Sequence, residues 1–403
     1  MALSFRAAAG SPAIYIDWSG DKDLAQYPLN SYTYTRFSAT TTKGADVKVY
    51  TYGEDETLSV FSMTGATMTN LDASPMKDLT TFTVDNAGLT DFVMPESPAL
   101  RELSLSGNAL ATIDLARFPE LSSLALNNNK LSQIDLSANP KLAMLSLANN
   151  EFTTLALNNS QLWHLDVTAN KLTDISFAGL PAIEQLALGS NELTSIDVDN
   201  LTNLKVMFLD HNKFTFAGLP QVKSQYALYT YSNQAVVEAE EIDGKIDLSA
   251  HRSAYGTDTK YTWYLDMPSF NEEGELEGEE LYADDEYVIT DGVTTFLKPF
   301  QNVVCVMTNE EFPKLYLYTP MMNVKGTTAI NAATASDRNI TISMDGSTIT
   351  VKAPAETTAT LYAVDGRTSR RTTLSSGESH FDNIQPGVYV LKIGKKAYKL
   401  NVK

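Results

Sequence analysis

Cysteine and long apolar runs are nearly absent from this chain of 403 residues. Cys305 is its only cysteine, which excludes an intramolecular disulfide and a zinc site built on cysteine ligands. No apolar run approaches the roughly 18 residues that a membrane-spanning helix requires, and the segment MALSFRAAAGSP lacks the apolar stretch of a signal peptide. Because Met1 is followed directly by small and polar residues, we expect that an export signal has been removed.

Basic residues are scarce as well. The 30 lysine and arginine residues face 49 aspartate and glutamate residues, which gives a formal net charge of −19. A surface with this charge repels nucleic-acid phosphates and anionic lipids. We therefore expect no nucleic-acid partner, and the short apolar runs lead us to expect no membrane-spanning segment.

The motifs of common catalytic sites are also missing. The sequence has no GxSxG, HExxH or Walker A motif, and no GxGxxG between a strand and a helix. Its four histidines stand in separate segments. Paired carboxylates for glycoside hydrolysis remain conceivable in a chain this acidic, but no segment resembles a catalytic fold. We expect no enzymatic activity, no catalytic residues, no cofactor and no metal site.

The main positive feature is a leucine repeat with the pattern LxxLxLxxNxL. Its first residue recurs in steps of 21, with one step of 20, at positions 58, 79, 100, 121, 142, 162, 183 and 204. The copies from Leu58 and Leu79 are degenerate, and QYALYTYSN, ending at Asn233, is assigned as a last partial copy. The remaining half of each unit reads LxxIxL, as in LSQIDL. Such short halves leave no room for a helix, so we predict an extended or turn-like back.

The alternation of a strand assigns a role to each position of the repeat. We predict that the three leucines of LxxLxL face inward and that the copies stack as a parallel sheet about 4.8 Å apart. The asparagine comes where the strand turns inward, and its amide can bond backbone groups that would otherwise cost about 1 to 3 kcal/mol each. We interpret this row as architectural: Asn108, Asn129, Asn150, Asn170, Asn191, Asn212 and Asn233.

These copies resemble the leucine-rich-repeat superfamily, specifically its 21-residue bacterial class with nested half-repeats. The resemblance implies a solenoid that recognises another macromolecule through the concave sheet. Outward residues are small in the early copies, whereas bulky ones appear from Leu162 onward. Because binding hot spots favour large aromatic residues, we hypothesise a ligand patch on the C-terminal half. Its candidate residues are Trp163, His164, Asp166, Lys205, Phe208, Asp210, His211, Tyr229 and Tyr231.

Several of these residues have alternative interpretations. Tyr226, Tyr229 and Tyr231 could cap the solenoid by packing against the following domain, and Trp163 could also have a packing role. His164, Asp166 and His211 could be considered as metal ligands, but they lie two copies apart, on strands separated by about 10 Å.

Two acidic features invite comparison with calcium sites. Asp114, Asp135 and Asp197 recur in the half-repeats, but Ala156 and Ser176 interrupt the row, which favours a solvated, backbone-bonded row. The segment NEEGELEGEELYADDE, residues 271–286, lacks the EF-hand spacing and is too charged to bury. We predict that it is a mobile loop.

The flanking segments alternate as β-strands do. Before the array, AIYIDWSGDKDL and ADVKVYTYG surround a predicted turn at Gly20 and Asp21, and they resemble the small β modules that precede repeats in bacterial surface proteins. After Asn233, short strands resemble an immunoglobulin-like domain, with Trp263 on a candidate third strand and Cys305 on a candidate sixth. Leu248 stands where a cysteine partner is expected, so we predict that Cys305 is a buried free thiol.

The last segment resembles the C-terminal sorting domain of type IX secretion, the Por secretion tail. The matching pieces are LYAVDGR at Leu361–Arg367, GVYVLKI at Gly387–Ile393 and KLNVK at Lys399–Lys403. A fibronectin-like module with similar turns is the alternative. The resemblance implies contact with secretion machinery and a protein that is secreted or anchored at the outer cell surface.

Together these observations predict a mainly β chain, a leucine-rich-repeat solenoid with a parallel sheet and an extended back, followed by two small β-sandwich domains. The expected boundaries are 1–57 for an N-terminal β cap, 58–235 for the solenoid, 236–325 for an immunoglobulin-like sandwich and 326–403 for a sorting-type sandwich. The expected function is recognition or adhesion by a monomer that binds a protein or polysaccharide ligand. The alternative is a structural spacer of the cell envelope without a ligand of its own.

Overall fold

The computed structural model describes residues 2–7, 13–17, 24–28, 35–38, 48–51, 58–65, 71–74, 76–326, 341–345, 347–353, 357–363, 369–374, 377–393 and 396–402. Within these residues the regular structure is β, apart from one short 3₁₀-helix, and none of it is a helix long and apolar enough to cross a membrane. The helix, η1, spans Ser249–His251. The mainly β prediction is therefore confirmed.

The chain forms two compact units. The first comprises Met1–Val236 together with two later segments, Ser253–Thr257 and Asn309–Leu317. The second comprises Val237–Arg252, Asp258–Thr308 and Tyr318–Lys403.

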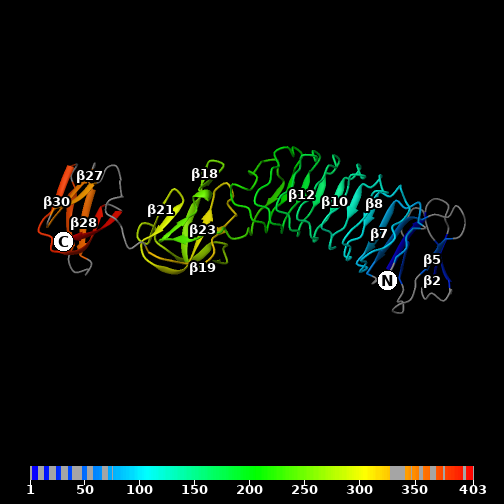
Figure 1. The fold of residues 1–403 in the computed structure, drawn as a ribbon, viewed down its shortest axis with the longest axis horizontal. Coiled ribbons are helices and arrows are strands. Elements are labelled where there is room, and N and C mark those ends of the chain that lie inside the picture. Colours follow the sequence, from blue (N-terminus) through cyan, green and yellow to red (C-terminus); the bar gives the residue numbers. More distant parts are fainter. Residues whose placement is uncertain are drawn as a thin grey trace. The chain divides into compact units, whose positions relative to one another are not determined.

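The first unit is built around a parallel sheet, whose strands lie side by side from blue to green in Figure 1. Each repeat contributes one strand, which pairs in parallel with the strands of its neighbours. These strands form the predicted leucine-rich-repeat solenoid, and turns and extended segments make up its back. They are β6 Leu58–Thr64, β7 Thr81–Asp85, β8 Glu102–Ser104, β9 Ser123–Ala125, β10 Met144–Ser146, β11 His164–Asp166, β12 Gln185–Ala187, β13 Val206–Phe208 and β14 Leu228–Thr230.

Leucine side chains fill the interior of the solenoid in continuous rows. The pairing places Leu103, Leu124 and Leu145 next to one another, and Leu165 and Leu186 extend the row. Each of these residues is at most 2% exposed. Because burial of one leucine contributes about 1.5 to 3 kcal/mol, these rows are the main source of stability in an array whose copies contact only their neighbours.

A row of asparagine side chains runs beside the leucines. Asn129 accepts a hydrogen bond from Leu110 N at 3.0 Å and donates to Leu105 O at 2.9 Å and Leu126 O at 3.1 Å. The side chain thus ties its own turn to the preceding copy, which confirms the architectural role. The same pattern recurs at Asn108, Asn150, Asn170, Asn191 and Asn212.

The last copy of the repeat departs from the predicted register. Tyr229 of β14 pairs with Met207 of β13, so the step between these copies is 22 residues (229 minus 207). Tyr226, Tyr229 and Tyr231 therefore occupy inward positions, where earlier copies have leucine. A shift of one residue moves every side chain of a strand to the opposite face. The prediction that these tyrosines face outward is wrong.

Gln234, and not Asn233, completes the asparagine row. Its Oε1 accepts a hydrogen bond from Asn212 N at 3.2 Å, and its Nε2 donates to Leu209 O at 3.0 Å. Asn233 has a φ of 54°, close to the 56° of Asn128, which stands one position before the row in its own copy. The predicted role of Asn233 is therefore wrong for the same reason, the longer step.

The two later segments of the first unit, Ser253–Thr257 and Asn309–Leu317, cover this tyrosine layer. Phe312 is fully buried, and its ring centroid lies 5.4 Å from that of Tyr231 and 6.3 Å from that of Phe216. Aromatic rings rather than exposed leucines thus close the end of the array. We refer to Tyr226, Tyr229 and Tyr231, together with Tyr255 and Phe312, as the aromatic cap.

The tyrosine hydroxyls find polar partners at the margin of the aromatic cap. Tyr229 donates a hydrogen bond to Pro220 O at 2.9 Å, and Tyr255 donates one to Leu219 O at 2.6 Å. Tyrosine suits this position because its ring is apolar while its hydroxyl can bond at the edge of the layer.

The first strand of the solenoid does not leave an open sheet edge. Strand β1 pairs antiparallel with both β6 and β4, so the sheet continues into the N-terminal segment. Three further strands form a separate sheet, and the predicted turn at Gly20 and Asp21 lies outside the described residues. The strands of this segment are β1 Ala2–Ala7, β2 Ala13–Asp17, β3 Leu24–Pro28, β4 Thr35–Ser38 and β5 Lys48–Thr51.

The aspartates of the half-repeats bond their own turns. Asp114, Asp135 and Asp197 each accept a hydrogen bond from the backbone N–H two residues later, at 3.0, 2.9 and 3.0 Å. This is the geometry of an Asx turn, in which the side chain replaces a backbone partner. The predicted backbone-bonded row is confirmed.

Two sheets form from the strands between residues 237 and 326, one of four strands and one of five. Trp263 connects them, because its Nε1 donates to Thr294 Oγ1 at 3.0 Å and its ring packs edge-on against Phe296 at 4.9 Å. Two short strands, β17 and β18, pair separately. The strands are β15 Glu241–Ile242, β16 Lys245–Asp247, β17 Ser253–Ala254, β18 Thr257–Asp258, β19 Lys260–Phe270, β20 Leu276–Glu280, β21 Tyr287–Thr290, β22 Val293–Phe296, β23 Phe300–Thr308, β24 Leu317–Tyr318 and β25 Met322–Val324.

One prediction for this region is confirmed and one is wrong. Cys305 lies opposite Trp263 and is a buried free thiol, and burial raises the pKa of that thiol. The acidic segment 271–286 is not a loop throughout, since it contains β20, which pairs with β19. Backbone pairing at a sheet edge requires no buried side chain, so the acidic residues of β20 stay exposed.

The C-terminal residues form two further antiparallel sheets around one apolar cluster. Leu361, Leu391 and Leu400 are each at most 2% exposed. The strands are β26 Thr341–Asp345, β27 Thr348–Ala353, β28 Thr357–Ala363, β29 Ser369–Leu374, β30 Gly377–Phe381, β31 Gly387–Ile393 and β32 Lys396–Val402.

Candidate ligand-binding surface

The outward face of the parallel sheet changes character halfway along the solenoid. One outward row of side chains, set by the strand pairing, runs through Met144, His164, Gln185, Val206 and Leu228. In the earlier copies the same row holds Ser123, Glu102 and Thr81. From β10 onward the row thus contains the apolar side chains Met144, Val206 and Leu228, whereas its earlier members are all polar.

Trp163 stands directly before β11, at the edge of this row. Its indole is 36% exposed, and Met144 of the preceding copy is 39% exposed. The ring centroids of Trp163 and His164 lie 5.7 Å apart, and His164 Nδ1 forms a hydrogen bond with Gln185 Oε1 at 3.1 Å. These contacts fix both rings while the indole remains partly exposed.

A second outward row contains Asp166 and Phe208, with Ala187 between them. Asp166 accepts a hydrogen bond from Thr168 N at 3.0 Å, and Phe208 is partly exposed. Leu228, on the last strand, is 46% exposed. We define the recognition strip as the apolar side chains of this half of the face: Met144, Trp163, Val206, Phe208 and Leu228.

Charged residues beside the strip are already paired. Lys205 Nζ lies 2.7 Å from Glu184 Oε2 of the preceding copy. An exposed pair of this kind contributes about 0 to 1 kcal/mol to stability. Both charges therefore stay accessible at the margin of the recognition strip, as in the polar rim of an interface.

Asp210 is bound by its neighbours within the solenoid. Its carboxylate accepts hydrogen bonds from the Thr230 hydroxyl, from Ser232 N at 2.9 Å and from Ser232 Oγ at 2.9 Å. Asp85 bonds the following copy in the same way, through Ser104 Oγ at 2.7 Å. Asp210 thus joins two copies, and its oxygens are largely occupied.

His211 lies in the turn that follows β13, not on the sheet. Its φ is 58°, in the left-handed region that the equivalent residue adopts in other copies, such as Ser190 at 56°. His164, Asp166 and His211 are not brought together. In the described part of the chain, no group of three or more histidine, cysteine, aspartate or glutamate side chains is placed to hold a metal ion.

Tyr229 and Tyr231 point into the solenoid, below the face on which they were expected. Burial raises the pKa of both hydroxyls, because ionisation inside the protein is unfavourable. The ring centroids of these residues lie 4.9 Å apart, within the aromatic cap. The two tyrosines belong to the packing of the last copy.

Of the predicted site residues, the structure therefore keeps Trp163, His164, Asp166, Lys205 and Phe208 on the outward face, and Asp210 contacts Thr230 of the same face. Sequence reasoning missed several members of the same surface. The outward alternation of LxxLxL could have identified Met144, Gln185 and Val206. It could not identify Leu228, because a step of 21 residues assigns that leucine to an inward position.

The stacked parallel strands, inward leucines and asparagine row define a leucine-rich-repeat solenoid. No protein-family model matches the chain, and no curated protein matches it. Among solved structures, the chain is similar to the functional domain of InlJ from Listeria monocytogenes, with 19% identity and a TM-score of 0.44 over 64% of this chain and 61% of that one. The chain thus spans about three fifths of the length of that structure.

Two further solved structures are similar over part of the chain. InlP from Listeria monocytogenes has 21% identity and a TM-score of 0.40, over 64% of this chain and 79% of that one. The leucine-rich repeat domain of APL1 has 21% identity and a TM-score of 0.29, over 40% of this chain and 49% of that one. These similarities concern the fold alone.

Proposed function

We propose that this chain is a non-enzymatic recognition or adhesion protein that binds a macromolecular ligand through the outward face of its solenoid. The observation that carries the proposal is the recognition strip, which gathers exposed and partly exposed apolar side chains in one half of the outward face. In a chain with a net charge of −19, such a strip is a costly surface to leave in water without a partner.

A protein is the favoured ligand over a polysaccharide. Met144, Val206 and Leu228 offer apolar contact but no hydrogen-bond partners for sugar hydroxyls. An apolar centre with charged residues such as Lys205 and Glu184 at its margin matches the anatomy of protein interfaces. Methionine also adapts its shape to varied partners.

The test uses the intact chain on protein and glycan arrays, with a double variant, Met144→Ala with Trp163→Ala. Loss of central anchors typically costs about 2 kcal/mol or more, so we expect bound ligand to fall at least about tenfold. Arg101→Ala is the matched control, because Arg101 precedes β8 as Trp163 precedes β11 and is also exposed. Equal binding by wild type, double variant and control contradicts the proposal, whereas absence of binding by all three favours the spacer alternative.

We also propose the four predicted segments as domains and the outer cell surface, or the medium, as the location. Support for an immunoglobulin-like domain is the buried Trp263, which joins two sheets opposite Cys305. Support for a sorting-type domain is that GVYVLKI forms the whole of β31, at Gly387–Ile393, and that β32 follows it.

Export provides the test of the sorting assignment. Removal of Gly387–Lys403 deletes two strands of the four-stranded sheet, β31 and β32, and we expect the protein to be retained inside the cell. Cell fractionation with immunodetection measures the exported share. A truncated protein that is exported as efficiently as the full chain contradicts the assignment.

A further inference from the structure

The last segment of the chain has the opposite charge to the rest. Residues 341–403 contain nine lysine and arginine residues and five aspartate and glutamate residues, whereas the whole chain has 30 basic and 49 acidic residues. The negative net charge therefore lies entirely before this segment. Opposite charges on two parts of one chain allow two copies to attract each other, provided that each part presents its charge on a defined surface.

The positive surface is the outward face of the sheet that contains β28, β31 and β32. The leucines of these strands are buried in the apolar cluster, so the alternate residues point away from it. The strand pairing places Tyr362 of β28 beside Val390 of β31, and Val390 beside Lys399 of β32. Val388 and Lys392 stand two residues from Val390 on the same strand. We define the basic face as Tyr362, Val388, Val390, Lys392 and Lys399.

The basic face is open to solvent and its charge is not neutralised. Tyr362 and Val388 are 41% and 37% exposed, and both lysines are exposed. Strands β28, β31 and β32 contain no aspartate or glutamate. Neither Lys392 nor Lys399 forms an ion pair among the described residues. The two lysines are diagonal neighbours, about 7 to 8 Å apart, so they can act on one partner.

The complementary surface is the tip of the hairpin formed by β19 and β20. Strand β23 pairs with β19 only as far as Leu265, whereas Phe270 pairs with β20 alone among the described strands. The loop that follows carries Glu272, Glu273 and Glu275, which are all exposed, and the side chain of Phe270 is 51% exposed. We define the acidic tip as Phe270, Glu272, Glu273 and Glu275.

Asn271 holds the acidic tip in one conformation. Its Oδ1 accepts hydrogen bonds from Glu273 N at 3.0 Å and from Glu275 N at 2.9 Å, and its own backbone N donates to Glu275 O at 2.9 Å. Because this loop is already ordered, docking on a partner costs less conformational entropy than it would for a flexible acidic segment.

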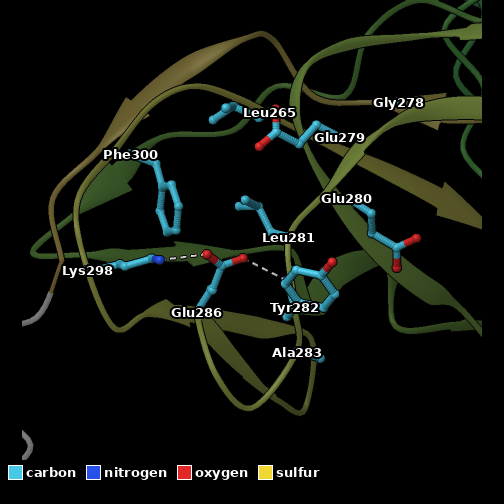
Figure 2. Close-up of a pocket in the computed structure, with 10 residues that line it drawn as sticks. All are labelled: Leu265, Gly278, Glu279, Glu280, Leu281, Tyr282, Ala283, Glu286, Lys298 and Phe300. Carbon is cyan, nitrogen blue, oxygen red and sulfur yellow. Dashed lines mark hydrogen bonds and ion pairs between the residues drawn. The ribbon is translucent and has the colours of Figure 1, made fainter. Parts of the chain in front are cut away.

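The base of the same hairpin does not concentrate its charge in this way. It borders an open cleft, at which the consecutive residues Glu279 and Glu280 point in different directions (Figure 2). Glu286, the third carboxylate of the cleft lining, is already paired with Lys298, at 2.6 Å. Acidic charge and an exposed apolar ring therefore occur together at the tip.

We propose that the acidic tip of one copy of this chain docks on the basic face of a second copy. Phe270 packs against Val388 and Val390, while the glutamates of the tip pair with Lys392 and Lys399. An apolar centre with charges at its margin is the usual anatomy of a protein interface. Both surfaces are small, so the contact is of the weak, transient kind.

This contact has two consequences for the state of the chain. Each copy offers one tip and one face, so the association is head-to-tail and can continue beyond a dimer. The monomer expected from the sequence is then the state at low concentration or high salt. The contact does not depend on the function proposed for the solenoid.

The first test is sedimentation velocity of the full chain over a wide range of concentration. At low salt we expect the sedimentation coefficient to rise with concentration. Association should weaken roughly tenfold at high salt, because the screening length falls from about 10 Å at 0.1 M to about 3 Å at 1 M. A chain that sediments as a monomer at every concentration overturns the proposal.

An exchange of charge tests which surfaces meet. Lys392→Glu with Lys399→Glu makes the face acidic, and Glu272→Lys with Glu273→Lys makes the tip basic. Each double variant alone should stay monomeric, because its tip and its face then have the same sign. An equimolar mixture should associate again, since each tip meets a face of opposite charge on the other variant. Circular dichroism checks that both variants are folded, and a mixture of folded variants that stays monomeric overturns the proposal.

Lys245→Glu with Lys260→Glu is the matched control, because it makes the same change of charge at two exposed lysines outside the basic face. Association close to that of the wild type supports the proposal. An equal loss in this control and in the variant of the basic face shows that net charge alone governs the association, and it overturns the assignment of the two surfaces.

Discussion

The middle and the end of the solenoid build the same interior layer from different residues. In the middle copies, leucines and an asparagine fill the layer, as with Leu145 and Asn150. In the last copy, tyrosines and Gln234 take these positions. A middle layer is covered on both sides by similar copies of the repeat, whereas the last layer meets a leucine-containing layer on one side and Phe312 on the other. Tyrosine serves both environments, because its ring packs while its hydroxyl bonds at the margin.

The largest effect is expected when the aromatic cap loses its buried phenylalanine. Phe312→Ala removes a fully buried ring that contacts the last tyrosine layer. Truncation of a buried phenylalanine costs about 3 to 5 kcal/mol. Because copies of a solenoid contact only their neighbours, we expect the loss to be local. Compared with the wild type, the variant should lose protection from hydrogen exchange in β13 and β14 and keep it in β8.

Phe312→Leu is the control for this experiment, since it keeps much of the apolar volume and should lose clearly less protection. Unchanged exchange in β14 after Phe312→Ala would mean that the tyrosine layer is stable without its cover. Equal loss at β8 and β14 would mean that the array unfolds as one unit, and the contrast between middle and end would then disappear.

The second prediction concerns the middle of the array. Leu145→Ala leaves a cavity in a row that is covered on both sides, and it should lower the free energy of unfolding by about 2 to 5 kcal/mol. Here we expect exchange to rise on both sides, in β9 and β11 alike. Urea unfolding of the full chain provides the second measurement, and a midpoint close to that of the wild type contradicts the core position of Leu145.

The difference between the middle and the end of the solenoid also explains which features the sequence predicted correctly. The period of 21 residues predicted the parallel sheet, the leucine rows and the asparagine row, because each depends on local alternation. It failed at the last copy because the step lengthens by one residue and Leu228 imitates an inward leucine. The missed signal was Tyr226, Tyr229, Tyr231 and Gln234, which keep the spacing LxxLxLxxN with other residue types.

Local sequence patterns do not predict contacts between residues that are far apart in the chain. Nothing in the repeat indicates that Asn309–Leu317 covers its last layer. The candidate surface was partly predictable, since outward alternation identified Trp163 and Phe208. His211 was misassigned because a left-handed turn, not alternation, determines its position, and alternation also gave no sign of the hydrogen bonds that Asp210 accepts.

The asparagine row offers a third and smaller contrast. Asn150→Ala leaves Leu131 N and Leu126 O without their buried partner, which should cost about 2 to 4 kcal/mol. Gln234→Ala should cost less, about 1 to 2 kcal/mol, because Gln234 is only partly buried and water can replace some of its bonds. Thermal unfolding of both variants tests the ranking. A larger loss for Gln234→Ala would show that the end of the row is the more critical part.

The smallest effect, and the most specific for the aromatic cap, is the pH dependence of Tyr229→Phe. At neutral pH the variant loses only the hydrogen bond to Pro220 O, about 0.5 to 1.5 kcal/mol. Burial raises the pKa of Tyr229 above its ordinary value of 10.0. Above that pH the unfolded chain loses the phenolic proton while the folded chain keeps it, so the free energy of unfolding falls as pH rises.

That fall amounts to at most about 1.4 kcal/mol per pH unit for one proton. Phenylalanine has no proton to lose, so the variant should decline less steeply, and the two stability curves should cross about one unit above pH 10. Hydrogen exchange of β14, corrected for its intrinsic dependence on pH, measures the local stability at each pH. Parallel curves would mean that Tyr229 ionises as readily in the folded chain as in the unfolded one. The last layer would then be open to water, whereas the leucine layers in the middle of the array are buried.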